Sequence, residues 1–327
     1  MLDIISIGDA TLDTFLKLRE ASVFYGPGKN EVKLALNFGD KIPVVHFAQK
    51  VAGNALNNAV GSARLGMKTA FYSIVGDDET GQKILRKMKR EGISLEYVKV
   101  DKGKDSNYSV VINYKGERTI LIYHTKRKYI LPKLEKSKWI YYTSVGEGYE
   151  KLQSQLVRHL RHDGIKLGFN PGTHQLNRGI VGMRSILKLT TVFFVNKEEA
   201  EKLAGHHADI KELLGQLKDY GPEIVVITDG PRGSYAFDGR DFYHMGILPI
   251  DLVEATGAGD AYATGFIAAL FHGRSTAEAM RWGSANSASV VTKIGPQDGL
   301  LKLSEMRKIL KKFAKYKPQK IDGDKSF

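Results

Sequence analysis

The strongest constraint on the fold of this 327-residue chain is a series of short, almost wholly apolar runs in its second half. Four of these runs cover residues 139–143, 167–170, 192–195 and 224–228, and helical stretches separate them. Strands that are apolar along their whole length are typical of a parallel sheet that helices cover on both faces. The sequence therefore predicts an α/β fold with a mostly parallel central sheet.

Two segments interrupt this pattern with β strands of a different kind. Residues 32–38 alternate apolar and polar side chains, and residues 108–114 and 118–124 flank a Lys-Gly-Glu turn as a hairpin. The economical arrangement is that two segments, about 14–48 and 97–126, pair into a small sheet that stands off the main domain. Such a sheet can be a lid that moves over a substrate and excludes water, or a contact between subunits.

The composition narrows the classes of function. The chain has no cysteine, which excludes disulfides, thiol catalysis and cysteine metal sites and agrees with a reducing compartment. No apolar run reaches membrane-spanning length and the first residues do not resemble a signal peptide, so we expect a cytoplasmic protein without a membrane partner. The nine histidines show no spacing typical of metal ligands, so we expect no structural metal.

The formal net charge of +13 would suit a negatively charged partner such as nucleic acid. The basic residues are scattered, however, and their densest runs, 83–90 and 307–320, are typical of solvated helix faces. No nucleic-acid-binding motif accompanies them, so we expect no nucleic-acid partner. The polar stretch 316–327 predicts a flexible C-terminal tail after one domain that spans residues 1–315.

A turn of small residues, Gly257-Ala258-Gly259, leads directly into Asp260 and an apolar helix. Backbone N–H groups are free at a helix N-terminus, where they attract anions. A carboxylate beside such an anion hole would repel a phosphate, unless it takes a proton from a hydroxyl group that attacks that phosphate. The competing interpretation is an ordinary Asp at a helix start.

The turn is one of two regions in which the chain resembles the PfkB (ribokinase-like) family of carbohydrate kinases; the other is 51–59, which leads into 64–66. Further matches follow in the order of the family: Gly8-Asp9 with Asp13, Val75-Gly76-Asp77-Asp78 with Gly81, Asn196-Lys197-Glu198-Glu199, and Thr228-Asp229-Gly230 with Gly233. The resemblance covers residues 2–315. It implies a three-layer αβα sandwich with a β lid over the sugar, and the use of ATP and Mg²⁺.

The resemblance also implies roles for individual residues. Asp260 would be the catalytic base, and the N–H groups of Gly257, Ala258 and Gly259 would form the anion hole. The residues expected at the nucleotide are Asn196, Glu199, Thr228, Gly230, Gly233 and Asn286. Glu199 would help to position Mg²⁺ through a water molecule. The spacing of Asn196 and Glu199 is also typical of a capping box at the start of a helix. The turn at 228–233 and the helix around Asn286 have purely structural interpretations as well.

On the acceptor side, Asp13, Gly53, Asn54 and Asn57 are expected to meet the hydroxyl groups of the substrate, each of which needs a partner when buried. The sequence departs from the family pattern twice. Ala52-Gly53 replaces a Gly-Gly pair, and Glu254-Ala255-Thr256 replaces an Asp-Thr-Thr run whose Asp helps to hold a monovalent cation in several relatives. The second change puts the use of such a cation in doubt.

The predicted function is ATP-dependent transfer of a phosphoryl group to a primary hydroxyl of a sugar or nucleoside, of the ribose, fructose or adenosine type. One alternative is a kinase for an acidic sugar that uses Lys126 or Arg127; a solvated basic turn is the simpler interpretation of these two residues. Another is a catalytically silent regulator that binds sugar or nucleotide, against which the intact Asp260 argues. A homodimer formed through the lid is the expected protein partnership.

Overall fold

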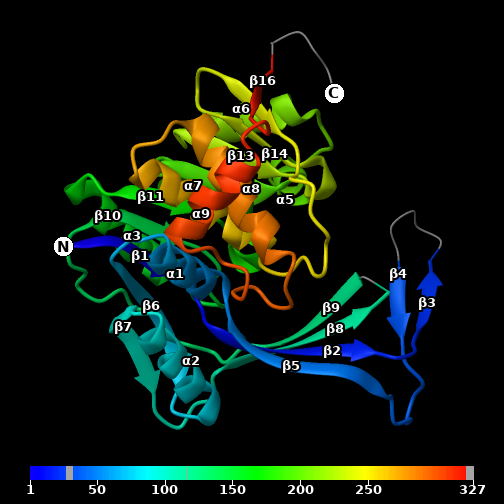
Figure 1. Cartoon of the computed structure of the whole chain (residues 1–327). Helices are drawn as coiled ribbons and strands as arrows, with labels where there is room; N and C mark the ends of the chain where they lie inside the picture. Colours follow the sequence, from blue (N-terminus) through cyan, green and yellow to red (C-terminus); the bar gives the residue numbers. More distant parts are fainter. Residues whose placement is uncertain (27–31, 116, 322–327) are drawn as a thin grey trace.

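The computed structural model describes residues 1–26, 32–115 and 117–321, and a large twisted sheet with helices on both faces dominates it (Figure 1). The strand order is β16-β15-β14-β13-β12-β11-β10-β1-β6-β7. The strands are β1 (Leu2–Ile7), β6 (Thr69–Gly76), β7 (Ser94–Asp101), β10 (Ser137–Tyr142), β11 (Lys166–Phe169), β12 (Val192–Asn196), β13 (Ile224–Thr228), β14 (Ser234–Phe237), β15 (Phe242–Met245) and β16 (Gln319–Lys320).

The four apolar runs of the sequence form β10 to β13, as predicted. They lie side by side in parallel, and their side chains are almost all buried. Among the described residues of this sheet, antiparallel pairing is confined to one edge, where β13 pairs with β14, β14 with β15, and β15 with β16. The α/β class with a mostly parallel central sheet is therefore confirmed.

The helices make the outer two layers of an αβα sandwich. They are α1 (Asn54–Arg64), α2 (Glu79–Arg90), α3 (Glu150–Asp163), α4 (Thr173–Leu187), α5 (Lys197–Ala204), α6 (Ile210–Asp219), α7 (Ala258–Phe271), α8 (Thr276–Val290) and α9 (Leu303–Lys312), with a short 3₁₀ turn η1 (Gly230–Arg232). Helices α3 to α6 share one apolar core with the sheet, and α7 to α9 share another on the opposite face. Helices α1 and α2 pack on the sheet beside α7. No helix in the described ranges is long and apolar enough to span a lipid bilayer.

A second sheet of four strands, in the order β5-β2-β8-β9, projects from the sandwich (Figure 1). Its strands are β2 (Thr11–Leu18), β5 (Val44–Ala52), β8 (Asn107–Tyr114) and β9 (Glu117–Tyr123), and the last two form the predicted hairpin. The expected strand at 32–38 is present as β4 (Val32–Ala35). It pairs with β3 (Ser22–Tyr25) in a separate hairpin, and not with the four-stranded sheet. We refer to the four-stranded sheet as the lid sheet.

Two predicted boundaries are wrong. Residues 97–101 belong to β7 and pair with β6 in the large sheet, so the second segment joins the lid sheet only from Asn107. The predicted loose tail begins too early, because β16 pairs with β15 and the ammonium of Lys320 lies 2.7 Å from a carboxylate oxygen of Asp241. Residues 322–327 lie outside the described residues. The assignment of residues 1–315 to one domain stays a prediction.

Candidate active site

Asp260 lies in the first turn of α7, and the residue is 8% exposed. The turn before it needs glycine: Gly257 has φ 80°, and a Cβ atom there would lie 2.4 Å from Cβ of Pro296. The side-chain amide of Asn57, on α1, donates a hydrogen bond of 2.8 Å to Asp260 Oδ2. The turn, the helix and α1 together hold the carboxylate at one position.

Burial raises the pKa of Asp260 to about 6, the hydrogen bond from Asn57 opposes that rise, and the carboxylates of Glu199 and Asp13 add to it. Glu199 and Asp13 are therefore within electrostatic reach of Asp260, although they come from β12–α5 and from the lid sheet. A carboxylate with a pKa near 6 is ionised at neutral pH and more basic than an exposed one. Asp260 is thus suited to accept a proton from a hydroxyl group.

The N-terminus of α7 offers two backbone donors beside this base. No described residue accepts a hydrogen bond from the N–H of Gly257 or Gly259, and the space around Gly259 is open. The third expected donor is already used, because the N–H of Ala258 donates to the carbonyl of Ala255 at 3.2 Å. The anion hole of Gly257, Ala258 and Gly259 stays a prediction, and in this structure the N–H groups of Gly257 and Gly259 are the ones free to serve it, together with the helix dipole.

Asn57 positions the carboxylate of Asp260. Its amide oxygen accepts a 2.9 Å hydrogen bond from the side chain of Gln297, while its nitrogen donates to Asp260. With its amide engaged at both ends and 3% exposed, Asn57 holds Asp260, whereas the sequence predicted a contact with substrate. Gln297 has no signal in the sequence, because it reaches Asn57 from a turn 240 residues away.

Asn58, the next residue of α1, links α1 to β1 and α7 through buried hydrogen bonds. Ser6 on β1 donates to the amide oxygen of Asn58 at 2.7 Å, and the amide nitrogen of Asn58 donates to Thr264 on α7 at 3.0 Å. The two helices approach closely, since a Cβ atom at Gly61 would lie 2.7 Å from Thr264 Cγ2. This packing fixes the distance between the base and the end of β1.

Asp13 lies on β2 in the lid sheet and is 8% exposed. Burial raises its pKa to about 6, against hydrogen bonds from the hydroxyl groups of Ser109 and Thr11. Its Oδ1 is buried, and none of the described residues donates to it. A buried acceptor without a partner is what a substrate hydroxyl can satisfy.

Gly53 and Asn54, two residues expected to contact the substrate, lie at the start of α1. Gly53 has φ 114°, and a Cβ atom there would lie 2.5 Å from the carbonyl oxygen of Asp9, so no other residue fits. Asn54 opens the helix and is half-buried. The structure therefore gives a steric reason for Gly53, while substrate contacts by Gly53 and Asn54 stay predictions.

Asp9 is a buried carboxylate to which the sequence assigned no role. It follows β1 and accepts hydrogen bonds of 2.9 Å from the hydroxyl of Tyr129 and from the N–H of Gly146, and its Oδ1 has no partner among the described residues. Burial raises its pKa to about 6. Asp9 thus joins the loop after β9 to the end of β1, next to the acceptor side of the site.

The expected nucleotide residues cluster at the carboxyl ends of β12 and β13, where Asn196 and Thr228 are directly opposite each other. Asn196 and Glu199 form a complete capping box: each side chain accepts from the backbone N–H of the other, at 2.8 and 2.9 Å. Burial raises the pKa of Glu199. The capping interpretation is confirmed, and the role of Glu199 toward Mg²⁺ stays a prediction.

The turn after β13 has a structural explanation. A Cβ atom at Gly233, whose φ is 90°, would lie 2.1 Å from the carbonyl of Met245, and the guanidinium of Arg232 pairs with both oxygens of Asp229 at 2.6 and 2.7 Å. Gly230 is exposed in the same turn and could face a nucleotide.

Asn286 is not part of the site. It is fully buried, its amide nitrogen donates to the carbonyl of Ala261 at 2.8 Å, and its oxygen accepts from the N–H of Leu301. The expected contact between Asn286 and ATP is wrong, because the residue holds α7, α8 and the following loop together.

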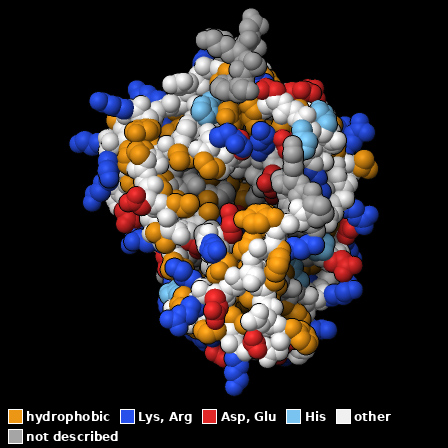
Figure 2. All heavy atoms as spheres, turned by 90° about the vertical axis from the view of Figure 1, so that its right-hand side faces the viewer, with side chains coloured by type: hydrophobic (Ala, Val, Ile, Leu, Met, Phe, Trp, Pro, Cys, Tyr) orange, Lys and Arg blue, Asp and Glu red, His pale blue; other side chains and the backbone are white. Residues whose placement is uncertain are grey.

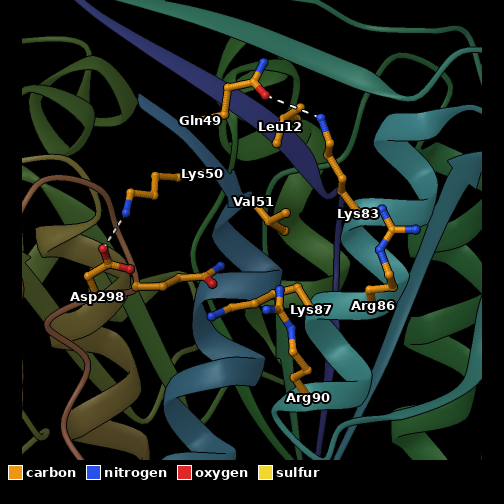
Figure 3. Close-up of a pocket in the computed structure, with 10 residues that line it drawn as sticks. Leu12, Gln49, Lys50, Val51, Lys83, Arg86, Lys87, Arg90 and Asp298 are labelled. Carbon is orange, nitrogen blue, oxygen red and sulfur yellow. Dashed lines mark hydrogen bonds and ion pairs between the residues drawn. The ribbon is translucent and has the colours of Figure 1, made fainter. Parts of the chain in front are cut away.

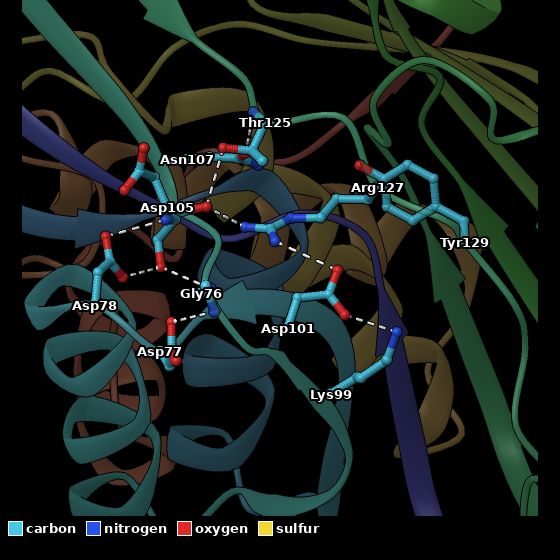
Figure 4. Close-up of polar contacts among 12 residues, drawn as sticks. Gly76, Asp77, Asp78, Lys99, Asp101, Asp105, Asn107, Thr125, Arg127 and Tyr129 are labelled. Carbon is cyan, nitrogen blue, oxygen red and sulfur yellow. Dashed lines mark hydrogen bonds and ion pairs between the residues drawn. The ribbon is translucent and has the colours of Figure 1, made fainter.

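A polar network joins the second segment of the lid sheet to the sandwich (Figure 4). Asp78 caps α2 by accepting from the N–H of Gly81 at 2.8 Å, and it also accepts from the backbone and hydroxyl of Ser106, just before β8. Gly76 has no room for a side chain, since its Cβ would lie 2.1 Å from the carbonyl of Lys104. The motif at residues 75–81 is therefore a joint between α2 and the lid sheet.

Arg127 belongs to this joint. Its side chain is wholly buried, donates to Asp101 at 3.4 Å and donates to the backbone carbonyl of Asp105 (Figure 4). The sequence suggested either a solvated turn or a ligand for an acidic substrate at Arg127. Its burial does not agree with either interpretation. Lys126 remains exposed, 3.4 Å from Glu147.

Residues 28–303 match the model of the pfkB family carbohydrate kinases. The chain belongs to this family. An uncharacterized sugar kinase of Archaeoglobus fulgidus is 30% identical over 257 residues, which are 74% of this chain and 98% of that protein. A 5-dehydro-2-deoxygluconokinase of Geobacillus thermodenitrificans is 28% identical over 298 residues, 84% of this chain and 88% of that one. The kinase is thus a phosphotransferase with an alcohol group as acceptor.

Solved structures agree on the fold of this pfkB-family kinase. Arabidopsis thaliana ribokinase, complexed with ribose and ATP, superposes with a TM-score of 0.76 at 19% identity, over 95% of this chain and 99% of that one. A nucleoside kinase of Burkholderia thailandensis in complex with inosine has a TM-score of 0.76 at 19% identity, over 97% of this chain and 100% of that one. The ribokinase fold implied by the sequence motifs is confirmed.

Proposed function

We propose that this kinase transfers the γ-phosphoryl group of ATP to a primary hydroxyl of a neutral sugar or nucleoside. The observation that carries the proposal is the buried carboxylate of Asp260, held by Asn57 beside the free N–H groups of Gly257 and Gly259. The base takes the proton of the attacking hydroxyl, and the helix N-terminus stabilises the charge on the transferred group. ATP-bound ribokinase and inosine-bound nucleoside kinase among the similar structures support this class of reaction.

The charges around the acceptor favour a neutral substrate. Asp13 and Asp260 both bring negative charge, and each raises the energy of an anion placed between them. The guanidinium of Arg127 is already engaged in the joint of the lid sheet. An acidic acceptor would depend on Lys126, which is exposed and has an ion-pair partner in Glu147.

The nucleotide would lie between the N-terminus of α7 and the ends of β12 and β13, near Asn196, Glu199, Thr228 and Gly230. Mg²⁺ takes most of its ligands from phosphate oxygens and water, with Glu199 acting through water. We assign no monovalent cation to the turn before Gly257. The carboxylate of Glu254 accepts from the backbone N–H groups of Thr256 at 3.2 Å and of Gly295 at 2.9 Å.

ATP consumption measured with a panel of acceptors tests the proposal. Neutral sugars and nucleosides should support turnover, with a phosphomonoester at a primary hydroxyl identified by mass spectrometry and phosphorus NMR. Turnover with sugar acids or sugar phosphates alone would establish the acidic alternative. Binding of nucleotide and sugar without turnover of any acceptor would favour the silent regulator.

The lid sheet also has a face suited to a second copy of the chain. Strand β9, at one edge of the lid sheet, is exposed along its whole length and carries four exposed large apolar side chains: Ile120, Leu121, Ile122 and Tyr123. Figure 2 shows hydrophobic side chains over this end of the molecule. Exposed apolar patches mark interfaces, so we propose a homodimer through the lid sheet.

Light scattering of the wild-type protein should give twice the monomer mass. The variant Leu121→Glu places a charge in the proposed interface and should give the mass of a monomer. A monomeric wild type would refute the dimer.

A further inference from the structure

A strongly basic pocket of about 430 Å³ lies where the lid sheet meets the sandwich (Figure 3). One wall comes from the lid sheet, with Leu12, Gln49 and Val51. The opposite wall is α2, and the turn that carries Gln297 and Asp298 closes the third side. The volume is within the range of small-molecule sites in proteins.

Four cations of α2 face this pocket: Lys83, Arg86, Lys87 and Arg90. Their spacing places them on one face of the helix over two turns, where like charges repel each other. Lys83 and Lys87 have partners in Glu79, at 3.1 Å, and Glu91, at 2.8 Å. The sequence predicted a solvated face here. Arg86 and Arg90 are indeed exposed, and the lid sheet lies opposite them as the second wall of the pocket.

The other lining charges do not neutralise the pocket. Lys50 on β5 adds a fifth cation, whose partner Asp298, at 2.6 Å, is the only carboxylate among the lining residues. In the described part of the chain nothing pairs with Arg86 or Arg90. These two guanidinium groups on successive turns are therefore free to bind an anion with two charged groups.

The pocket lies behind the lid sheet as seen from the active site. Leu12 and Val51 are opposite each other in the β2–β5 register, and strand alternation turns them away from the face that carries Asp13. Lys50 is opposite Asp13 in the same register, and it lines the pocket from the edge strand β5. Gln297 lines the pocket and donates to Asn57, which in turn donates to the base Asp260. The pocket therefore contacts both the joint of the lid sheet and the hydrogen-bond chain that positions the base.

We propose that this pocket is a second binding site, for a small anion that carries two phosphate groups. The basic side chains select phosphate, and none of the ten lining residues is aromatic, so the pocket has no surface on which a nucleobase could stack. A sugar bisphosphate and inorganic pyrophosphate share this chemistry. Bound behind the lid sheet, the anion opposes movement of the sheet away from the active site, which lowers the KM of the acceptor. This regulatory step rests on the proposed kinase function.

Binding of inorganic pyrophosphate to the full-length protein tests the site. Calorimetry is carried out with a non-hydrolysable ATP analogue and Mg²⁺ in excess, so that the nucleotide site is filled. The double variant Arg86→Gln/Arg90→Gln should bind pyrophosphate at least about tenfold more weakly, the effect of losing one charge-assisted hydrogen bond. The matched control is Arg158→Gln/Arg161→Gln, which removes two exposed guanidinium groups from α3 on the other face of the sandwich.

Wild-type protein and the α3 control should bind equally well. Absence of binding to wild type, or equal binding by the α2 double variant, would overturn the site. In the kinetic arm, pyrophosphate with excess Mg²⁺ should lower the acceptor KM about fivefold in wild type, a modest allosteric coupling, and not in the α2 variant. Binding without a change in KM overturns the regulation alone. If no acceptor is phosphorylated, the proposed function fails, and calorimetry still decides the site.

Discussion

Asp260→Asn should lower kcat by at least about 100-fold, the low end for loss of a general base, while fold and nucleotide binding stay intact. The amide oxygen of the variant can still accept from Asn57, so the geometry of the site is preserved. It cannot take the proton of the acceptor hydroxyl at neutral pH. Steady-state kinetics with the acceptor found in the panel, and calorimetry with an ATP analogue, measure the two effects.

The same substitution should leave thermal stability unchanged or raise it above pH 6. Burial raises the pKa of Asp260 from 3.8 to about 6, so the folded state holds a proton that the unfolded state has lost, and stability falls as the pH rises between these values. Asp219→Asn, at an exposed carboxylate of α6, is the control and should change neither quantity. Turnover of Asp260→Asn close to that of wild type would exclude Asp260 as the base.

Asp13→Ala should raise the KM of the acceptor by about tenfold or more and also lower kcat. Its unpaired buried oxygen is the expected partner of a substrate hydroxyl, and a loosely held hydroxyl attacks less often. Asp13→Asn keeps an acceptor oxygen and should recover part of the lost activity. Kinetics of the purified variants against acceptor concentration separate the two parameters.

Lys126→Ala is the matched test of substrate charge and should have little effect on either parameter. Arg127→Ala does not serve this purpose, because its buried guanidinium holds the joint of the lid sheet and its loss would disturb the sheet for any substrate. A mild Asp13→Ala together with an inactive Lys126→Ala would reject the neutral acceptor and favour an acidic one.

The fold was largely predictable because its signals are local. Apolar runs predict β10 to β13 from the burial of both faces of each strand, and the turn at 115–117 predicts the hairpin of β8 and β9. The pairing of β3 with β4 and the return of β16 to the sheet edge were missed. These two pairings depend on which strand edges are free after the rest of the chain has folded, and a short sequence pattern does not contain this information.

For the candidate site, too, local motifs indicated some residues, while others arise only from tertiary contacts. The turn before Asp260 drew attention to this residue in the sequence, but its hydrogen-bond partner Asn57 is 203 residues away and was expected to contact the substrate. Asp9, Gln297 and the burial of Arg127 arise only from tertiary contacts, so residue type and spacing gave no signal for them. The motif around Asp78 was a weak signal by itself and counted only as one of an ordered set of motifs, and the structure explains it as a joint of the lid sheet.

The pH dependence of kcat/KM for the acceptor, at saturating ATP and Mg²⁺, tests the role of Asp260 most directly. The base must be ionised, and its pKa is about 6, so kcat/KM should fall tenfold per unit as the pH drops below that value and reach a plateau above about pH 7. Burial also raises the pKa of Asp13 to about 6, so the profile is repeated with Asp13→Asn, which should keep the acidic limb. The residual activity of Asp260→Asn should lack the limb. A kcat/KM that stays constant between about pH 5 and pH 8 in wild type would contradict the assignment of Asp260 as the catalytic base.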